Sequence, residues 1–468
     1  MRRLLLAVAL LPGCSTPAGG GRPPNVLVFI CDDLGEADLG CYGHPFLKTP
    51  NVDRLAAEGM RFDRMFLTIS SCSPSRASIL TGRFPHNTGA EDLHQPLPAG
   101  QRTVARALRD AGWHAFSVGK WHLGAAEKSN WDRVVECGGD EIAERTVAEL
   151  RARPAGKPFF AWIATWDPHR PWDEVPPAHD PAKVAVPPYL PEHPDIRKEL
   201  AKYYDEIARI DRHVGEVRDE LARLGEFDRS VFVFMSDNGM PFPRAKTTLY
   251  DSGIRTPFVV RAPGLVPAGT VQKGLASAID LAPAILELAG LRQDSMQGRS
   301  LLPMLRDARS PGRPAVFAEA NWHDFDQFTR AVRTDRYLLV RNYYKERPLW
   351  NSVDSIHSPT WRAILSLRRE GKLTPSQAYL FQEPRPFEEL YDLATDPHAF
   401  RDLAGDPAHA RPLAELRILL DHWRVETEDA MPREPTPDGW TREGVPLPHN
   451  QPWFERWQKL GPAAFEKF

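Results

Sequence analysis

The sequence predicts an α/β protein: a large, mainly parallel sheet sandwiched by helices, with a smaller C-terminal α+β subdomain. Two observations lead to this prediction. From residue 25 onward, apolar β-branched runs alternate with helical patterns, which is typical of a parallel sheet covered by helices. After about residue 305 the composition shifts toward aromatic and basic side chains. We therefore expect a large domain over residues 25–305 and a C-terminal subdomain, with a small sheet and a helix, over residues 306–468.

Each element follows from a local pattern. Residues 25–30 are apolar on both faces, which predicts a central strand. Between about 195 and 225, apolar residues recur at intervals of three and four, which predicts one long helix whose charged face, including Arg209, is solvated. The other expected strands are 114–118, 158–165, 230–235, 257–261 and 335–341, and the other expected helices are 50–58, 103–111, 280–289 and 410–424.

Net charge and cysteine spacing argue against nucleic-acid binding, a zinc site and a disulfide framework. Among 468 residues the formal net charge is only -3, so no global field favours nucleic acid or another anionic polymer. The five cysteines lack CxxC spacing, which argues against a zinc site and against a disulfide framework. Any attraction for an anionic ligand must therefore come from local residues.

Residues 1–24 have the pattern of an export signal followed by a tether rich in Gly and Pro. A charged start precedes the apolar run 4–11, and Cys14 follows small residues, as at a bacterial lipoprotein processing site. We expect export to the bacterial periplasm or cell envelope with lipid anchoring at Cys14. The alternative is an ordinary cleaved signal peptide. No other apolar stretch approaches the roughly 20 residues of a membrane helix.

The run from residue 72 to residue 83, Cys-Ser-Pro-Ser-Arg-Ala-Ser-Ile-Leu-Thr-Gly-Arg, predicts a site for a sulfate or phosphate group. Pro74 and Ser75 suit the first turn of a short helix, where free amides favour an anion, and Arg76 adds a fork for its oxygens. Cys72 and Arg76 are four residues apart, whereas cysteine phosphatases need six, so that class is disfavoured. The alternative is a buried structural cysteine at a helix start.

Polar residues also follow several expected strands. Asp32 and Asp33 come after the first strand, and Asp237 and Asn238 come after the strand at 230–235, so the four should meet at one sheet edge. Such oxygen ligands suit calcium or magnesium better than zinc. The alternative for either pair alone is a structural role in a turn or a helix cap. Three further residues near strand ends are candidates for acid-base work and oxyanion binding: Lys120, His122 and His169.

The 72–83 run resembles the signature of the type I sulfatases at every specified position. The resemblance implies an alkaline-phosphatase-like fold and the oxidation of Cys72 to formylglycine by a formylglycine-generating enzyme. It also implies a calcium ion, with magnesium as the alternative, held by Asp32, Asp33, Asp237 and Asn238 together with residue 72. One hydroxyl of the hydrated aldehyde would attack sulfur, and the second would allow the sulfated intermediate to collapse.

Catalytic roles follow from the same resemblance. Asp237 is expected to be the base and His169 the acid that protonates the leaving group. His122 is the proton acceptor when sulfate is ejected. Three cations, Arg76, Lys120 and Lys246, would stabilise the anionic oxygens.

Four short segments of the chain, at 70–78, 93–95, 236–243 and 424–428, resemble the sulfamidases, which are the heparan N-sulfatases. Lys246 is a departure, because sulfamidases tend to have arginine there. Asp92 and His94 are candidates for lining a sugar pocket. The alternative is that they only stabilise a turn at the surface. Asp251 and Arg255 are interpreted as structural.

The sequence is compatible with three functions. The leading hypothesis is a metal-dependent sulfatase acting outside the cytoplasm on sulfated glycans, at glucosamine. A phosphonate or phosphate ester hydrolase is the second, because fold does not fix substrate. A non-catalytic glycan-binding relative is the third, and the complete set of site residues argues against it.

Overall fold

The expected central strand is β1 (Asn25–Cys31), and all seven of its residues are buried. It belongs to a computed structural model that describes residues 22–172, 175–292, 294–434, 436–441, 445–451 and 455. The predicted signal segment and Cys14 lie outside the described residues. Within the part of the chain that is described, no helix is both long and apolar enough to cross a membrane.

Eight strands form the large sheet, in the order β10-β2-β9-β7-β1-β6-β4-β5. Only β9 runs against its neighbours, so the sheet is mainly parallel, as predicted. In the parallel β1/β7 pair, Cys31 lies opposite Ser236, so the residues that follow these two strands emerge side by side. The other seven strands are β2 (Met60–Phe62), β4 (His114–Gly119), β5 (Arg133–Val135), β6 (Phe159–Ala164), β7 (Ser230–Ser236), β9 (Phe258–Arg261) and β10 (Thr270–Gln272).

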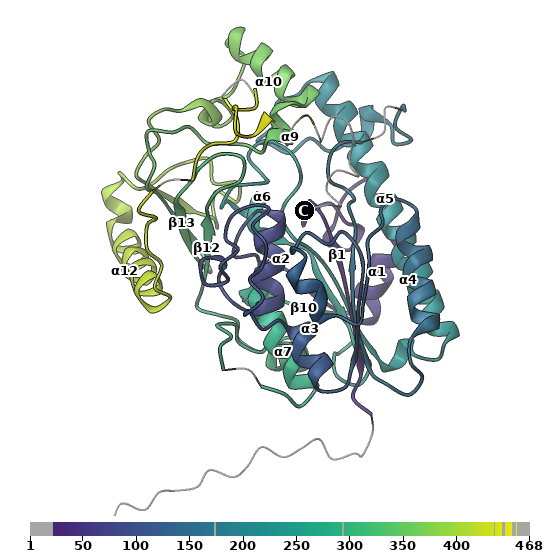
Figure 1. Cartoon of the computed structure of the whole chain (residues 1–468). Coiled ribbons are helices and arrows are strands. Elements are labelled where there is room, and N and C mark those ends of the chain that lie inside the picture. The colour runs from purple at the N-terminus through teal and green to yellow at the C-terminus, as the bar shows by residue number, and fades with distance from the viewer. Residues whose placement is uncertain are drawn as a thin grey trace, which may run out of the picture.

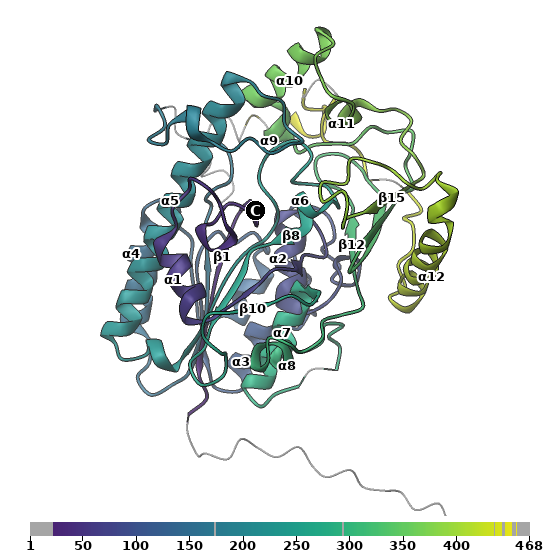
Figure 2. The same cartoon turned by 180° about the vertical axis from the view of Figure 1, so that it is seen from behind.

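Helices cover both faces of this sheet (Figures 1 and 2). One face carries α1 (Pro50–Glu58), α4 (Glu141–Ala152) and the 30-residue α5 (Pro194–Arg223), and both α1 and α4 pack against α5. The opposite face carries α2 (Cys72–Thr81), α3 (Val104–Asp110) and α7 (Leu281–Leu288). The other α-helices before the last one are α6 (Asp251–Ile254), α8 (Leu302–Arg306), α9 (Val353–Ile356), α10 (Pro359–Arg369) and α11 (Pro375–Ala378). A three-stranded sheet is made of β3 (Met65–Phe66), β8 (Arg255–Thr256) and β11 (Ala276–Ser277).

The C-terminal part forms a four-stranded antiparallel sheet with one long helix packed on it. Its strands are β12 (Ala315–Ala320), β13 (Thr329–Thr334), β14 (Tyr337–Asn342) and β15 (Glu388–Asp392), and its helix is α12 (Ala410–Glu426). Figure 1 shows α12 on the outer side of β12 and β13, away from the large sheet. Buried side chains of this small sheet, such as Val316 and Leu338, join the hydrophobic core of the large sheet. The other face of the small sheet, with Val332 and Leu339, packs with Leu416 and Leu420 of α12 in a second hydrophobic cluster. The division at residue 305 stays a prediction.

Candidate active site

The carboxyl ends of β1 and β7 bring four predicted site residues together. The amide of Asp237 donates to the carbonyl of Cys31 at 3.1 Å, and the amide of Asp33 donates to Oδ1 of Asp237 at 3.3 Å. The side-chain amide of Asn238 donates to Oδ1 of Asp33. Asp33 has a φ of 74°, a conformation that is costly for a residue with a Cβ. The chain turns sharply there and directs both aspartates into the site.

These oxygens fit a hard divalent cation. One carboxylate oxygen each from Asp32, Asp33 and Asp237 lies within 4.8 Å of the other two. Burial raises the pKa of Asp33 and of Asp237 to about 7, and the neighbouring carboxylates add to this, so the three charges repel one another. Oδ1 of Asp32 and Oδ1 of Asn238 are buried without a hydrogen-bond partner among the described residues. A calcium or magnesium ion would satisfy these oxygens and offset the repulsion.

Helix α2 places Cys72 beside the carboxylates. The helix begins at Cys72 after the extended Ser71 and ends before Gly82, whose φ of 64° is left-handed. All ten of its residues are buried, so this is not an ordinary amphipathic helix. The Cys72 thiol lies 4.0 Å from Oδ1 of Asp33. Burial, followed by the Asp32 carboxylate, raises the pKa of this thiol well above its usual value, so the surroundings do not favour a thiolate.

Three buried cations line the same space. Nε of Arg76 donates to Oδ2 of Asp237 at 2.7 Å, and its Nη1 donates to the carbonyl of Lys120 at 3.2 Å. Nη2 of Arg76 is buried without a partner among the described residues. Lys120 pairs with Asp32, and Nζ of Lys246 lies 2.8 Å from Oδ2 of Asp33. A buried donor without an acceptor, next to two ammonium groups, is the arrangement that an oxyanion ligand would complete.

The predicted histidines lie in the same region. Nε2 of His122 is 2.6 Å from Nδ1 of His94, and Nδ1 of His122 is buried with no partner among the described residues. Nδ1 of His169 faces the carbonyl of Arg170, which leaves Nε2 directed at the site, 3.9 Å from Oδ2 of Asp33. Burial, and then the Lys246 charge, lower the pKa of His169 to about 4. We call the ten residues Asp32, Asp33, Cys72, Arg76, Lys120, His122, His169, Asp237, Asn238 and Lys246 the strand-end cluster.

Two residues that lie next to the strand-end cluster, Asp354 and His323, could not be identified from any sequence motif. Asp354, in α9, has its Oδ2 3.3 Å from Nζ of Lys246. His323 has its Nδ1 2.7 Å from the hydroxyl of Ser71, the residue before Cys72. Both come from the C-terminal part of the chain, neither follows a strand of the large sheet, and no motif marks either of them.

The two candidates for a sugar pocket differ in position: His94 touches the cluster through His122, and Asp92 lies outside it. Asp92 accepts hydrogen bonds from the amide of Trp322 at 3.1 Å and from the hydroxyl of Thr436 at 3.2 Å, so it ties two loops together. The amide of His94 donates to the hydroxyl of Ser73 at 2.8 Å, which holds His94 beside the start of α2. Asp251 pairs with Arg333, away from the cluster, in keeping with its structural interpretation.

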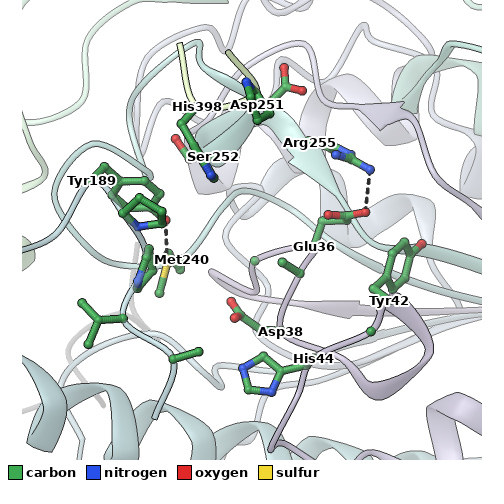
Figure 3. Close-up of a pocket in the computed structure, with 18 of the residues that line it drawn as sticks. Glu36, Asp38, Tyr42, His44, Tyr189, Met240, Asp251, Ser252, Arg255 and His398 are labelled. Atoms are coloured by element: carbon green, nitrogen blue, oxygen red, sulfur yellow. Dashed lines mark hydrogen bonds and ion pairs between the residues drawn. The ribbon is translucent and has the colours of Figure 1, made fainter. Parts of the chain in front are cut away.

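Two cavities border the strand ends. The first, about 540 Å³, is lined by His169 of the cluster, by Asp354, by further residues of α5, α9 and α10 such as Lys198 and Arg362, and by Trp440. It gives a ligand access to the cluster. The second, about 410 Å³, is drawn in Figure 3 and is lined by Glu36, Asp38, Tyr42, His44, Tyr189, Met240, Asp251, Ser252, Arg255 and His398 among others. We call this second cavity the acidic pocket.

The fold has a well-matched counterpart among solved structures. A protein solved in complex with its substrate, D-glucosamine-2-N,6-O-disulfate, superposes with a TM-score of 0.71 at 21% sequence identity, over 88% of this chain and 100% of that one. The likeness and the sheet described above assign the chain to the alkaline-phosphatase-like α/β proteins.

Sequence comparison defines the family. The family model described as Sulfatase matches residues 24–291, and a model described as N-sulphoglucosamine sulphohydrolase, C-terminal, matches residues 244–367. The chain is 32% identical to human N-sulphoglucosamine sulphohydrolase, over 92% of this chain and 95% of that protein. It is 29% identical to an ulvan-active sulfatase of Formosa agariphila, over 87% of this chain and 75% of that one. The chain belongs to the sulfatase family, and the predicted resemblance is confirmed.

Proposed function

We propose that the protein is an exported sulfatase that removes sulfate from glucosamine residues of sulfated glycans, through a formylglycine at position 72 and a bound divalent metal. The observation that supports this most directly is the set of unsatisfied groups around Cys72. A carboxylate oxygen of Asp32 and the amide oxygen of Asn238 have no partner among the described residues, and neither has a guanidinium nitrogen of Arg76. A metal and a sulfate group would satisfy these atoms.

The metal would be held by Asp32, Asp33, Asp237 and Asn238, with residue 72 beside them. When bound, the cation would polarise a sulfate oxygen and the nucleophile. Formylglycine would supply a hydrated aldehyde as that nucleophile, which a thiol with a raised pKa does not provide.

The protein's own side chains would bind the substrate and move its protons. Arg76, Lys120 and Lys246 surround the position of the sulfate oxygens, and being buried they would act in a medium of low dielectric, where charge is most effective. Asp237 would accept a proton from the nucleophile, and Nε2 of His169 would donate one to the leaving atom. His122 would take up a proton when sulfate is released, and its buried Nδ1 has no partner among the described residues.

The choice between N-sulfate and O-sulfate is part of the proposal. The match of residues 244–367 to the model described as N-sulphoglucosamine sulphohydrolase, C-terminal, supports the N-sulfate. Lys246 lies within this region and stands where sulfamidases tend to have arginine. We propose the N-sulfate as the preferred group, with the 6-O-sulfate as the alternative.

Sulfate release should be measured with protein in which mass spectrometry confirms oxidation of Cys72. The substrates are an N-sulfated and a 6-O-sulfated glucosamine disaccharide, with a phosphate and a phosphonate monoester in parallel. Faster release from the N-sulfate is expected. Faster turnover of the phosphorus esters would identify a phosphonate or phosphate ester hydrolase instead, and no turnover by the oxidised protein would indicate a glycan-binding relative.

Export and lipid anchoring also remain proposals. They rest on the charged and apolar start of the chain and on Cys14. Expression of the full chain and of a Cys14→Ala variant in a bacterial host, followed by membrane fractionation, tests them. Membrane association that is lost in the variant is expected, whereas equal partitioning of the two proteins would reject the anchor.

A further inference from the structure

A carboxylate from the C-terminal part of the chain lies among the cations of the strand-end cluster. Oδ2 of Asp354 is 3.3 Å from Nζ of Lys246 and 3.5 Å from Nε2 of His169. Its side chain is 19% exposed and lines the cavity of about 540 Å³ that leads to the cluster. Asp354 therefore touches the two residues assigned to sulfate binding and to leaving-group protonation, and it remains accessible to a ligand.

The local structure holds this carboxylate in one position. Oδ1 of Asp354 accepts the amide of Ser355 at 2.7 Å, so the side chain is bonded to its own helix. The amide of Val353 donates to Oδ2 of Asp324 at 2.8 Å, and the hydroxyls of Ser352 and Ser355 bond at 2.9 Å. Because the start of α9 is fixed at several points, Oδ2 of Asp354 is preorganised to accept a further hydrogen bond from a ligand.

The leaving atom of the substrate would lie next to this oxygen. To be protonated by His169, the leaving atom must lie about 3 Å from Nε2, which is the distance of a hydrogen bond. Because Oδ2 of Asp354 is only 3.5 Å from Nε2, the same atom can also lie within hydrogen-bond distance of Asp354. We propose that Asp354 is a specificity-determining residue that accepts a hydrogen bond from the sulfamate nitrogen and so favours N-sulfated over O-sulfated substrates. This inference rests on the proposed function.

The chemistry of the two substrates differs at that atom. A sulfamate nitrogen carries one N–H and can donate to Asp354, whereas the bridging oxygen of a sulfate ester carries no hydrogen and would face the carboxylate with lone pairs. Hydrolysis converts R–NH–SO₃⁻ and water into R–NH₃⁺ and SO₄²⁻. The S–N bond breaks, an S–O bond forms, and the nitrogen takes one proton from His169 and a second from solvent. Asp354 would also stabilise the resulting ammonium group, which an ester does not produce.

A variant comparison tests the proposal against a purely structural role. Asp354→Asn keeps the size of the side chain but removes its charge, and Asp195→Asn removes a carboxylate that lines the same cavity without contacting Lys246 or His169. For each protein, kcat/KM is measured on N-sulfated and 6-O-sulfated glucosamine disaccharides. Asp354→Asn is expected to lower the ratio of N-sulfate to O-sulfate activity at least about tenfold, and Asp195→Asn to leave it unchanged.

Other patterns would overturn the proposal. Equal losses on both substrates in Asp354→Asn would mean that Asp354 only positions Lys246. If the ratio of N-sulfate to O-sulfate activity also falls in Asp195→Asn, the preference for N-sulfate comes from the overall negative charge of the cavity and not from Asp354.

A binding measurement separates this inference from the proposed function. Calorimetry compares glucosamine, which is protonated near neutral pH, with glucose, in wild-type protein and in Asp354→Asn. Tighter binding of glucosamine by the wild type, with that preference lost in the variant, is expected. An absent or unchanged preference overturns the role of Asp354 whatever the kinetics. If the oxidised wild type released sulfate from neither disaccharide, the proposed function would fail and the role of Asp354 would be decided by this measurement.

Discussion

The strand-end cluster and the acidic pocket are built from the same kinds of residue, and both include residues that follow β1. In the acidic pocket the acidic side chains of Glu36 and Asp38 both have partners. Glu36 pairs with Arg255 at 2.9 Å, as the dashed line in Figure 3 shows, and Oδ2 of Asp38 accepts the hydroxyl of Tyr203 at 3.0 Å. In the strand-end cluster, by contrast, Oδ1 of Asp32 and Nη2 of Arg76 are buried without partners among the described residues.

This difference teaches which buried charges indicate chemistry. Buried polar groups in folded proteins are nearly always satisfied, because an unsatisfied group costs about 1–3 kcal/mol. A cluster that leaves several of them open is therefore a candidate place for a ligand that would supply the missing bonds. The acidic pocket, although it also contains several charged residues, has no such open groups among its described lining residues.

The largest expected effect tests the nucleophile of the strand-end cluster. Cys72→Ser should lower sulfate release by at least about 10⁴-fold, because serine has one hydroxyl and no aldehyde to hydrate. The melting temperature should change little, since only one buried heteroatom is exchanged. Steady-state kinetics and thermal unfolding check this, and turnover near the wild-type rate in the variant would overturn the aldehyde mechanism.

The next effect tests the metal. Treatment with a chelator should lower activity about 10³-fold, and added Ca²⁺ should restore it. Independently of activity, Ca²⁺ at about 100 times its Kd should stabilise the wild-type protein by about 2.7 kcal/mol. Asp33→Asn, which removes one of three clustered carboxylates, should abolish most of this stabilisation in thermal unfolding. Equal stabilisation of both proteins would place the ion elsewhere.

A paired charge should affect stability but not chemistry. His86, in the 3₁₀ helix Pro85–Asn87, lies 2.5 Å from Oε2 of Glu319 in β12. Burial lowers the pKa of His86, but the Glu319 carboxylate outweighs it, so the folded value is raised. The added stability is therefore present below the ordinary pKa of about 6.5 and is lost as pH rises through the folded value. His86→Gln should destabilise by about 1.5 kcal/mol at pH 5.5 and by less at pH 9.

Denaturant unfolding at the two pH values measures this loss for the wild type and for His86→Gln. Activity should be unchanged. A loss of stability that grows toward alkaline pH would contradict the pairing with Glu319.

The smallest effect is expected in the acidic pocket. Burial raises the pKa of Glu36 to about 7 in spite of Arg255, so the stability that this residue contributes is greater below pH 7 than above it. In free energy of unfolding, Glu36→Gln should therefore compare more favourably with the wild type at pH 8 than at pH 5. Sulfate release should be unaltered. A large loss of turnover would show that the two regions are not functionally separate.

The sequence was sufficient for the parts of the site that lie at strand ends. Strand β1 and strand β7 are recognisable from their apolar residues, and parallel pairing forces Asp32 and Asp237 to emerge together. The prediction for Arg209 was wrong. It was assigned to a solvated helix face, yet it binds both carboxylate oxygens of Asp167, at 2.7 and 2.8 Å, because α5 runs beside the loop after β6. Helical periodicity identifies the apolar face but not what borders the polar one.

Asp354 and His323 could not be predicted for a different reason. They reach the strand-end cluster through the packing of the C-terminal part on the large sheet, and that packing has no local sequence pattern. Contacts between residues more than 250 positions apart, such as that of Ser71 with His323, depend on tertiary structure alone.

The burial of α2 has a consequence for how the protein must be made. Cys72 is 2% exposed and lies in a helix whose ten residues are all buried, so a second protein could not reach its thiol once the chain has folded. Any enzyme that oxidises Cys72 must therefore act on the nascent or still extended polypeptide. If Cys72 is oxidised as proposed, the oxidation must therefore precede folding, and a chain that folds first would keep its thiol until it unfolds again.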